Sequence, residues 1–386
     1  CLSQCAAGVD ITGYIALVAE GRYADAVRLI RKDNPLPAVC GLICEHPCEV
    51  RCRRTMIDDP INIRGLKRFA VDHAGDVPLP VPAVSTGKTV AVIGGGPGGI
   101  SAAYYLSLMG HEVTIFEQRK KLGGMLRYGI PNYRLPREIL DQEINHLLSI
   151  GIKVVTEVTV GENPTVADLR KDYDAVYIAI GAQTDRKIGI EGEDAEGVIS
   201  AVELLRGIGD GNMPDFTGKD IVVIGGGNVA MDVARSSIRL GAKRLRIAYR
   251  RRAVDMTAMA EEVSGAVEEG CELLDLHAPL RIEKDAEGKV AALWVKPQII
   301  GPVKNGRPVP LDSAQEEVRL ACDMVIVAVG QGIESKAFEK NGIPVKRGVI
   351  EALNWSGVNT KELTGIFAGG DCVTGPATVI RAIAAG

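Results

Sequence analysis

Two segments of this chain combine an apolar strand, a glycine-rich turn and a helix, and they constrain the fold more than any other feature. The first spans residues 89–117 and the second spans residues 220–250. This order of elements is typical of parallel α/β architecture. Apolar strands followed by glycine also occur on both sides of the second segment, at 175–181 and 324–330. We therefore predict an α/β fold with two Rossmann-like nucleotide-binding domains, the second inserted into the first.

The first glycine turn has the G-x-G-x-x-G spacing of a dinucleotide site. Gly94 permits a tight turn, Gly96 lets the backbone approach a pyrophosphate, and Gly99 lets the helix pack on the strand. The N-terminus of the helix favours the phosphate charge. Glu117, 23 residues after Gly94, can accept hydrogen bonds from the adenosine ribose. A purely structural turn is the alternative, but the strand, the helix and the acid together favour a bound dinucleotide.

The second turn keeps the glycine pattern but changes the residue at the end of the next strand. The positions of the three glycines hold Gly225, Gly227 and Ala230. Arg250 stands where the first unit has its acid, and Arg251 follows it. A carboxylate would repel a 2′-phosphate, whereas guanidinium groups bind it. This predicts NADPH, with NADH and a merely solvated basic cluster as the alternatives.

Two dinucleotide units on one chain suggest that a hydride passes between a nicotinamide and a flavin. This transfer requires stacked rings and needs no acid or base from the protein. We therefore predict FAD and NADPH as cofactors and no catalytic side chain.

Cysteines crowd the start of the chain. Cys40, Cys44, Cys48 and Cys52 follow one another at intervals of four, as do Cys1 and Cys5. Pro47 disfavours one continuous helix and favours a loop around a metal centre. Nucleotide motifs argue against disulfides, and the lack of C-x2-C pairs argues against zinc, so iron–sulfur clusters are favoured. Six cysteines cannot supply eight ligands, which leaves one cluster, or two that are completed from elsewhere.

Charge and hydropathy exclude other classes of function. The net charge is −4 and the pI is near 5.9, so there is no overall basic field for nucleic acid. Residues 89–110 carry no charge, but their glycine-rich turn breaks a membrane helix, so we expect no membrane span. We expect a cytoplasmic protein. A chain that begins at Cys1 and stops within the run 377–386 looks like an excerpt of a longer polypeptide.

Five longer motifs lie at 34–52, 60–70, 123–136, 249–252 and 365–386. Together they resemble one known family, which contains the glutamate synthase small subunit, the N-terminal half of dihydropyrimidine dehydrogenase and the large subunit of NADH-dependent ferredoxin:NADP oxidoreductase. The resemblance implies a helical domain with two [4Fe-4S] clusters, followed by an FAD domain that an NADPH domain interrupts. Electrons would pass between NADPH, FAD, the clusters and a partner subunit, with ferredoxin as a candidate partner and a hetero-oligomer as the expected assembly.

The resemblance also implies ligands for the clusters. Cys5, Cys44 and Cys48 would hold one cluster, and Cys1 and Cys52 would join an upstream pair of cysteines in the other.

The family often has Gln or Glu at the position of Lys67. An ammonium group cannot ligate iron, so Cys40 is a candidate substitute.

For FAD, the resemblance adds residues from two further motifs. Gly123, Gly124 and Met125 would lie beside the flavin. Asp371 would face the ribityl or pyrophosphate group, and the helix near Thr378 would point at the carbonyl edge of the flavin. The remaining candidate cofactor-binding residues are Pro97, Gly181, Asn228, Gly330 and Gly370.

The predicted domains are an α-helical [4Fe-4S] domain (1–87), the first part of an FAD domain (88–198), an NADPH domain (199–327) and the second part of the FAD domain (328–386). The predicted function is that of an NAD(P)H-dependent electron-transfer subunit. The alternative is a stand-alone flavin disulfide or quinone reductase whose cysteine segment binds zinc.

Overall fold

The chain leaves one folded unit after residue 183 and returns to it at residue 332, so a second unit is inserted into the first. Unit 1 holds the residues up to Arg127, Asn132–Gln183 and Gly332–Gly386, and unit 2 holds Tyr128–Pro131 and Thr184–Gln331. The computed structural model describes residues 2–353, 357–358 and 363–386. The insertion agrees with the order of elements predicted from the sequence.

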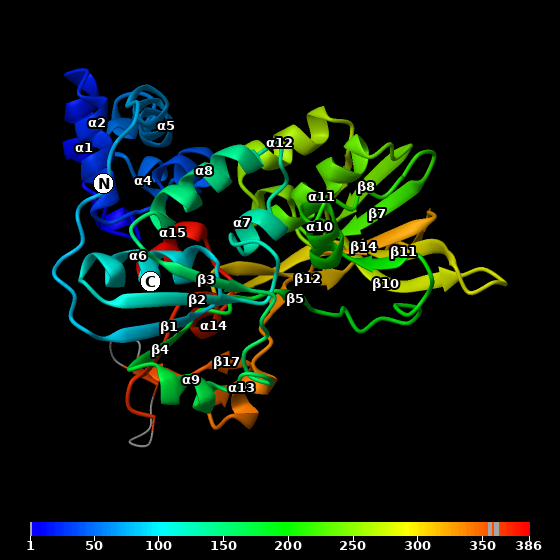
Figure 1. Ribbon diagram of the computed structural model, residues 1–386. Helices are drawn as coiled ribbons and strands as arrows, with labels where there is room; N and C mark the ends of the chain where they lie inside the picture. Colours follow the sequence, from blue (N-terminus) through cyan, green and yellow to red (C-terminus); the bar gives the residue numbers. More distant parts are fainter. Residues whose placement is uncertain (1, 354–356, 359–362) are drawn as a thin grey trace. The chain divides into compact units, whose positions relative to one another are not determined.

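Residues 2–77 of unit 1, called here the cysteine segment, form short helices as predicted (Figure 1). Asp10 and Asn62 cap α1 and α5 by accepting hydrogen bonds from backbone amides of the first turn. The fully buried Tyr14 donates its hydroxyl hydrogen to the carbonyl of Ile63 at 2.9 Å, which ties α1 to α5. The helices are η1 (Leu2–Gln4), α1 (Ile11–Ala19), α2 (Tyr23–Arg31), α3 (Pro37–Ile43), α4 (Pro47–Val50), η2 (Arg53–Met56) and α5 (Ile63–His73).

The rest of unit 1 is built on a seven-stranded sheet in the order β18-β19-β20-β4-β1-β2-β3. The five strands from β20 to β3 run parallel, and β19 is antiparallel to both of its neighbours. The strands are β1 (Thr89–Ile93), β2 (Glu112–Glu117), β3 (Lys153–Thr156), β4 (Ala175–Ile178), β18 (Ala352–Leu353), β19 (Gly357–Val358) and β20 (Ile366–Ala368), with a separate pair β16 (Val345–Lys346) and β17 (Val349–Ile350).

Helices cover both faces of this sheet, which explains why β1 is apolar along its length. Ala91 packs in one core with Val166 of α9, while the neighbouring Val92 faces Gly99 of α6 on the opposite face. On the outer side of α6, Ser101 donates to the carbonyl of Ile383 in α15 at 3.0 Å. The helices are α6 (Pro97–Leu108), α7 (Met125–Tyr128), α8 (Arg137–Leu148), α9 (Val166–Asp172), α13 (Lys336–Lys340), α14 (Asp371–Thr374) and α15 (Val379–Ala385).

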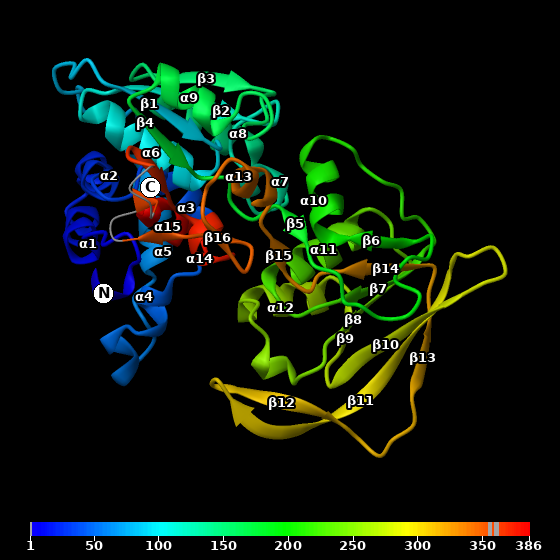
Figure 2. The same ribbon diagram turned by 90° about the horizontal axis from the view of Figure 1, so that it is seen from below.

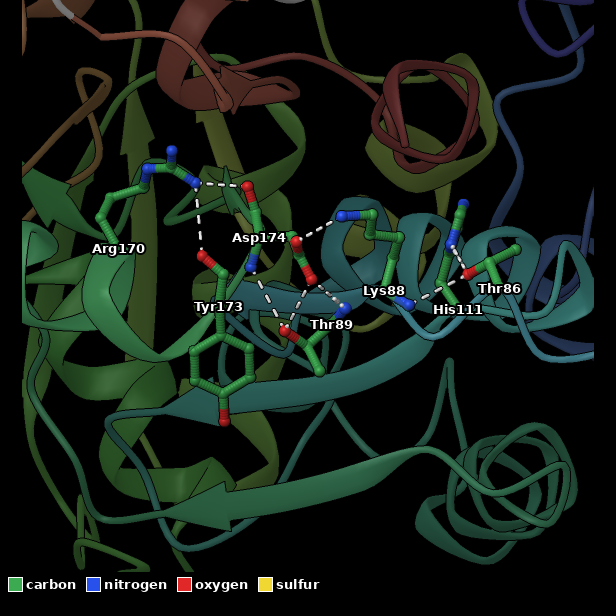
Figure 3. A network of polar contacts seen from close by, with 7 residues as sticks. All are labelled: Thr86, Lys88, Thr89, His111, Arg170, Tyr173 and Asp174. Carbon is green, nitrogen blue, oxygen red and sulfur yellow. Dashed lines mark hydrogen bonds and ion pairs between the residues drawn. The ribbon is translucent and has the colours of Figure 1, made fainter.

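A polar network fixes the start of β1 against β4 (Figure 3). The Asp174 carboxylate accepts hydrogen bonds from the Thr89 amide at 2.9 Å and from Lys88 Nζ at 2.8 Å. Arg170 donates to the carbonyls of Tyr173 and Asp174. The lysine and the amide hold the pKa of Asp174 at about 2, below its usual range.

Unit 2 contains a five-stranded parallel sheet in the order β6-β14-β7-β8-β9. Val223 and Ile247 share a core with Val233 of α11 on one face. Val222 and Leu293 share a second core on the other face, where an antiparallel sheet replaces the helices. The parallel strands are β6 (Val198–Ser200), β7 (Asp220–Ile224), β8 (Arg244–Ala248), β9 (Glu272–Leu274) and β14 (Met324–Val327).

The antiparallel sheet of unit 2 is dominated by the long strand β11, which pairs with β10, β12 and β13 (Figure 2). Its strands are β10 (His277–Lys284), β11 (Val290–Lys304), β12 (Arg307–Asp312) and β13 (Val318–Ala321). The other elements of this part of the chain are α10 (Ala201–Gly209), α11 (Asn228–Arg239), η3 (Ala253–Asp255), α12 (Ala260–Glu268) and the pair β5 (Thr184–Asp185) and β15 (Gln331–Gly332).

The uncharged stretch 89–110 divides into β1, the glycine turn and the twelve-residue α6. In the described part of the chain no helix combines the length and the apolar character that crossing a membrane requires.

Candidate functional site

The glycine turn between β1 and α6 has room for a Cβ at its middle glycine but not at the two outer ones. Gly94 has a φ of +107°, and a Cβ there would overlap the carbonyl oxygen of Ala179. A Cβ on Gly99 would overlap the carbonyl oxygen of Gly94. At Gly96, by contrast, the nearest atom to an added Cβ is the Gly124 Cα at 3.8 Å. Packing therefore requires the two outer glycines but not the middle one, which lies at the start of α6, where a phosphate is favoured.

A second pair of glycines, far away in the sequence, packs against this turn. The Gly123 amide donates to the carbonyl of Gly95 at 2.7 Å, and a Cβ on Gly124 would lie 2.8 Å from the Gly96 Cα. α7 starts directly afterwards at Met125. The structure therefore brings together the two motifs that the sequence assigned to one flavin site.

Glu117, at the end of β2, is 3% exposed and supports the same turn. Its Oε2 accepts from the Gly95 amide at 2.8 Å and its Oε1 from the Arg119 amide at 2.9 Å. Burial raises the pKa of Glu117, and these amides oppose the shift. Each carboxylate oxygen has a further lone pair, so Glu117 can shape the turn and still accept a ribose hydroxyl.

The C-terminal motif lies against the same helix. Gly370 has a φ of +75°, and Asp371 begins α14. Burial raises the pKa of Asp371 to about 6, and a backbone hydrogen bond from Ala377 opposes the shift. Thr378 precedes α15, in which the carbonyl of Ala382 approaches Gly98 of α6. Two other candidates, Pro97 and Gly181, lie at the first residue of α6 and after β4, with a φ of +68° at the glycine.

The glycine turn of unit 2 repeats this geometry. A Cβ on Gly225 would overlap the carbonyl oxygen of Ala328, whereas at Gly227 the nearest atom is Thr257 Oγ1 at 3.5 Å. Ala230 is fully buried in α11. The Asn228 side chain accepts from the Met259 amide at 2.9 Å, so it fixes the loop before α12. Gly330, with a φ of +133°, follows β14.

The three arginines after β8 differ in their partners. Arg251 Nε donates to the carbonyl of Pro308 at 2.9 Å, and Arg252 forms an ion pair with Asp255 at 2.8 Å. Arg250 is exposed, and within the described residues its guanidinium group has no hydrogen bond or ion pair. Of the three, Arg250 is the one best able to bind an added phosphate.

Arg307, on β12, supports this loop and was not predicted from the sequence. Its Nη2 donates to the Tyr249 hydroxyl at 3.0 Å and to the carbonyl of Asp255 at 2.7 Å. The hairpin of β11 and β12 thus holds the arginine loop in place. No local signal could reveal this contact, because the partners are more than fifty residues apart in the sequence.

Three of the predicted cluster ligands, Cys5, Cys44 and Cys48, lie close enough for their thiols to interact electrostatically. Burial raises the pKa of the Cys48 thiol to about 11, with further contributions from Cys44 and Cys5. The same three thiols add to the burial that raises the pKa of Tyr14. α3 ends before Cys44 and α4 starts at Pro47, so the cysteine run is not one helix, as predicted.

The remaining cysteines of the segment lie in different surroundings. Cys40 is fully buried in α3, and its Sγ is 3.8 Å from Asn34 Oδ1. Burial raises the pKa of Cys40 to about 12, and the buried Lys67 opposes this shift. Backbone hydrogen bonds lower the pKa of Cys52. Cys1 lies outside the described residues.

All eight described cysteines are free thiols. Among the described residues, no group of three or more His, Cys, Asp or Glu side chains converges on one point to hold a single ion, as zinc requires. A [4Fe-4S] cluster is bound differently, with one thiolate on each iron, so its ligands surround a cube. Free thiols in two short helices and in the segment between them suit that group.

The fold and these sites define a class: a nucleotide-dependent oxidoreductase preceded by a cysteine-rich helical segment. Residues 88–386 match the family described as pyridine nucleotide-disulphide oxidoreductase, and residues 1–77 match the one described as dihydropyrimidine dehydrogenase domain II, 4Fe-4S cluster. The chain belongs to the pyridine nucleotide-disulphide oxidoreductase family. This confirms the predicted resemblance and the predicted type of enzyme.

Similar proteins include several that are named as the beta subunit or the small chain of an enzyme. The chain is 38% identical to the NADP(+)-dependent formate dehydrogenase subunit beta of Moorella thermoacetica, over 100% of this chain and 58% of that protein. It is 35% identical to the NADPH-Fe(3+) oxidoreductase subunit beta of Geobacter sulfurreducens, over 99% and 61%. It is 33% identical to the glutamate synthase [NADPH] small chain of Escherichia coli K12, over 100% and 86%. The chain thus spans about three fifths of the first two relatives. These names favour the electron-transfer interpretation over the stand-alone reductase.

Solved structures confirm the predicted fold class. Mycobacterium tuberculosis FprA in complex with NADPH gives a TM-score of 0.66 at 21% identity, over 77% of this chain and 83% of that one. Lactococcus lactis thioredoxin reductase gives 0.57 at 22% identity, over 77% and 94%. At this level of identity the likeness concerns the fold alone.

Proposed function

We propose that this chain is the NADPH-dependent FAD and iron–sulfur electron-transfer subunit of a larger enzyme. The observation that carries the proposal lies in unit 1. There the glycine turn at Gly96 and the thiols of Cys5, Cys44 and Cys48, the last two of them buried, belong to one folded unit. A dinucleotide site and a cluster site in one folded unit suit electron transfer between them.

We assign FAD to unit 1 and NADPH to unit 2. Bound FAD would accept two electrons as hydride and release them singly. Gly94, Gly96 and Gly99 would seat its pyrophosphate, and Glu117 would orient its ribose. The other residues assigned to FAD are Pro97, Gly123, Gly124, Met125, Gly181, Gly370, Asp371 and Thr378.

In unit 2, Gly225 and Gly227 would seat the pyrophosphate of NADPH, and Arg250 would bind the 2′-phosphate. Arg251 would take part through the guanidinium nitrogens that do not contact Pro308. The other residues assigned to NADPH are Asn228, Ala230 and Gly330. The predicted domain boundaries, 88–198 and 328–386 for FAD and 199–327 for NADPH, differ from the unit boundaries at residues 183 and 331. We therefore assign the whole of 184–331, with Gly330, to NADPH.

We assign residues 1–87 to one or two [4Fe-4S] clusters. Cys5, Cys44 and Cys48 would hold the first cluster, with Cys40 as the candidate for its fourth ligand. Cys1 and Cys52 would belong to a second cluster.

The electrons would pass to or from a partner subunit in a hetero-oligomer. Relatives named subunit beta or small chain support this assignment. The partner would be a catalytic or electron-accepting protein, with ferredoxin as one candidate. Free cysteines suit a reducing compartment, which supports the cytoplasm.

The purified, reconstituted protein tests this function. We expect a flavin absorption spectrum, bound iron and acid-labile sulfide, and faster bleaching of the flavin by NADPH than by NADH. Electron paramagnetic resonance after reduction by NADPH should show a reduced cluster. A reconstituted protein without flavin, or one in which zinc replaces iron, would contradict the proposal.

A further inference from the structure

A buried carboxylate joins the cysteine segment to the rest of unit 1. Glu143, on α8, is 7% exposed. Its Oε1 accepts a hydrogen bond from the Ala38 amide and its Oε2 accepts one from the Val39 amide, both at 2.8 Å. These amides lie in the first turn of α3, which starts at Pro37. Glu143 therefore serves as the N-terminal cap of a helix that lies 105 residues earlier in the sequence.

The cap is needed because α3 has no local one. The first amides of a helix have no partner within the helix. Leu36, at the N-cap position, has no polar side chain, and its own amide donates to Asn34 Oδ1 at 3.0 Å. Pro37 has no amide hydrogen. Ala38 and Val39 are the next donors, and Glu143 satisfies both.

α3 carries cysteines whose positions follow from its own. Cys40 lies within the helix, and Cys44 follows its last residue. α3 also packs closely on α5, since a Cβ on Gly41 would lie 3.1 Å from the Cα of Arg68. A shift of α3 would therefore move the thiols of Cys40 and Cys44, and it would also disturb the packing of α3 on α5.

Two further hydrogen bonds connect the same parts of unit 1. His146 lies one turn after Glu143 on α8, and its Nε2 is hydrogen-bonded to the carbonyl oxygen of Val77 at 3.1 Å. The Tyr105 hydroxyl, on α6, donates to the carbonyl of Arg31 at 3.2 Å. α6 begins at the glycine turn assigned to FAD. The hydrogen bonds of Glu143, His146 and Tyr105, called here the junction, therefore connect the cysteine segment to α8 and to the helix that follows this turn.

We propose that Glu143 is a positioning residue for electron transfer between the flavin and the cluster of Cys44 and its neighbours. The proposal rests on the proposed function. In this step one electron leaves the reduced flavin, which is oxidised, and enters the cluster, which is reduced, while no bond forms or breaks between them. The protein then controls the rate through the distance and orientation of the two centres. Glu143 fixes both by holding α3 on α8.

Glu143→Gln in the full holoenzyme tests the proposal, with Glu138→Gln as the matched control. Burial raises the pKa of Glu143 to about 7 against the opposing effect of the two amides, so the variants are compared at pH 8, above that value. Glutamine offers one acceptor oxygen, and its amino group would face a second N–H donor. Glu138 is exposed on the same helix, so the same change there leaves the junction intact.

Stopped-flow mixing with NADPH gives the rate of flavin bleaching, and freeze-quench electron paramagnetic resonance gives the rate of cluster reduction. In Glu143→Gln we expect cluster reduction to slow by about tenfold, because small misplacements have large effects on rates. Flavin bleaching should keep its wild-type rate, since NADPH binds in unit 2. The control should match the wild type in both phases.

Unchanged phases in Glu143→Gln, or equal slowing of both, would overturn the proposal. A wild-type protein without bleaching or without a cluster signal would instead contradict the proposed function.

The rates are compared per reduced cluster. If Glu143 had a purely structural role, its loss would lower the iron content but leave these rates unchanged. Unchanged rates with a lower iron content would therefore count against the proposal. If Glu143→Gln cannot be isolated with its cluster, Tyr105→Phe removes one hydroxyl from the same junction. A slower cluster phase with unchanged bleaching in that variant would support the proposal. An unchanged cluster phase would overturn it.

Discussion

At the scale of single residues, partners distinguish side chains that the sequence makes look alike. Arg250, Arg251 and Arg252 are consecutive, yet within the described residues only the guanidinium group of Arg250 makes no hydrogen bond or ion pair. We expect Arg250→Glu to raise the KM for NADPH by about tenfold or more, because a charge-assisted hydrogen bond to phosphate is replaced by repulsion. The KM for NADH should change far less, because NADH lacks the 2′-phosphate.

Lys243→Glu is the matched control for Arg250→Glu. Lys243 is exposed and directly precedes β8, whereas Arg250 follows the other end of that strand. The Lys243→Glu change should leave the KM for NADPH and the KM for NADH unchanged. Steady-state bleaching of the flavin with each nucleotide gives the comparison. Equal effects of Arg250→Glu on NADPH and NADH would remove the assignment of the 2′-phosphate to Arg250.

The same scale shows what the sequence could predict. The glycines at Gly94 and Gly225 follow from local spacing, because a tight turn leaves no room for a side chain. Glu143 and Arg307 could not be predicted, because their partners lie far away in the chain and only the folded structure brings them together. For α3, the absence of a capping side chain at Leu36 was a visible hint that some remote acceptor was needed. That hint does not say which residue supplies it.

At the scale of elements, Asp174 holds the start of β1 against β4. Lys88 and the Thr89 amide lower its pKa to about 2, from an ordinary value of 3.8. A lowered pKa in the folded state means that the carboxylate stabilises the fold above about pH 4, and that this contribution is lost as the pH falls towards 2. We expect Asp174→Asn to have a lower Tm than the wild type at pH 7. This difference in Tm should become smaller as the pH falls.

Asp172→Asn provides the control for Asp174→Asn, since Asp172 is exposed at the end of α9 and does not contact β1. It should unfold like the wild type across this pH range. Thermal unfolding followed by circular dichroism between pH 7 and pH 3 measures the differences. A gap between Asp174→Asn and the wild type that stays constant down to pH 3 would show that the carboxylate does not act through its charge.

The contact between α1 and α5 gives a second prediction at this scale. The Tyr14 hydroxyl is buried and donates to the Ile63 carbonyl at 2.9 Å. Tyr14→Phe leaves that carbonyl without its donor and should lower the free energy of unfolding by about 1 kcal/mol. Urea denaturation of the holoprotein measures it. Tyr173→Phe is the control, because the Tyr173 hydroxyl has no hydrogen bond within the described residues. Equal stabilities of Tyr14→Phe and the control would contradict the assigned role.

At the scale of the whole molecule, the two units have separate hydrophobic cores. One set of buried residues surrounds the seven-stranded sheet and another surrounds the five-stranded sheet. The insertion of unit 2 was predictable because strands followed by glycine recur on both sides of it. The extent of the antiparallel sheet was not predictable, since β11 to β13 carry no motif and their pairing depends on contacts within the folded unit.

Separate cores predict that a ligand of one unit stabilises that unit selectively. A ligand that binds the folded state alone stabilises it by about 2.7 kcal/mol at a hundredfold excess over its Kd. We expect NADP+ at that excess to slow amide hydrogen exchange in residues 225–230 and 249–257 of unit 2, while the core strands of unit 1 exchange at their unliganded rates. Mass spectrometry of peptides from the full holoprotein measures this protection. NAD+ at the same concentration should protect these segments less, and Arg250→Glu should reduce the protection by NADP+ to the level of NAD+. Protection of the seven-stranded sheet equal to that of the arginine loop would mean that the units respond as one body, and the selective assignment of NADPH to unit 2 would have to be abandoned.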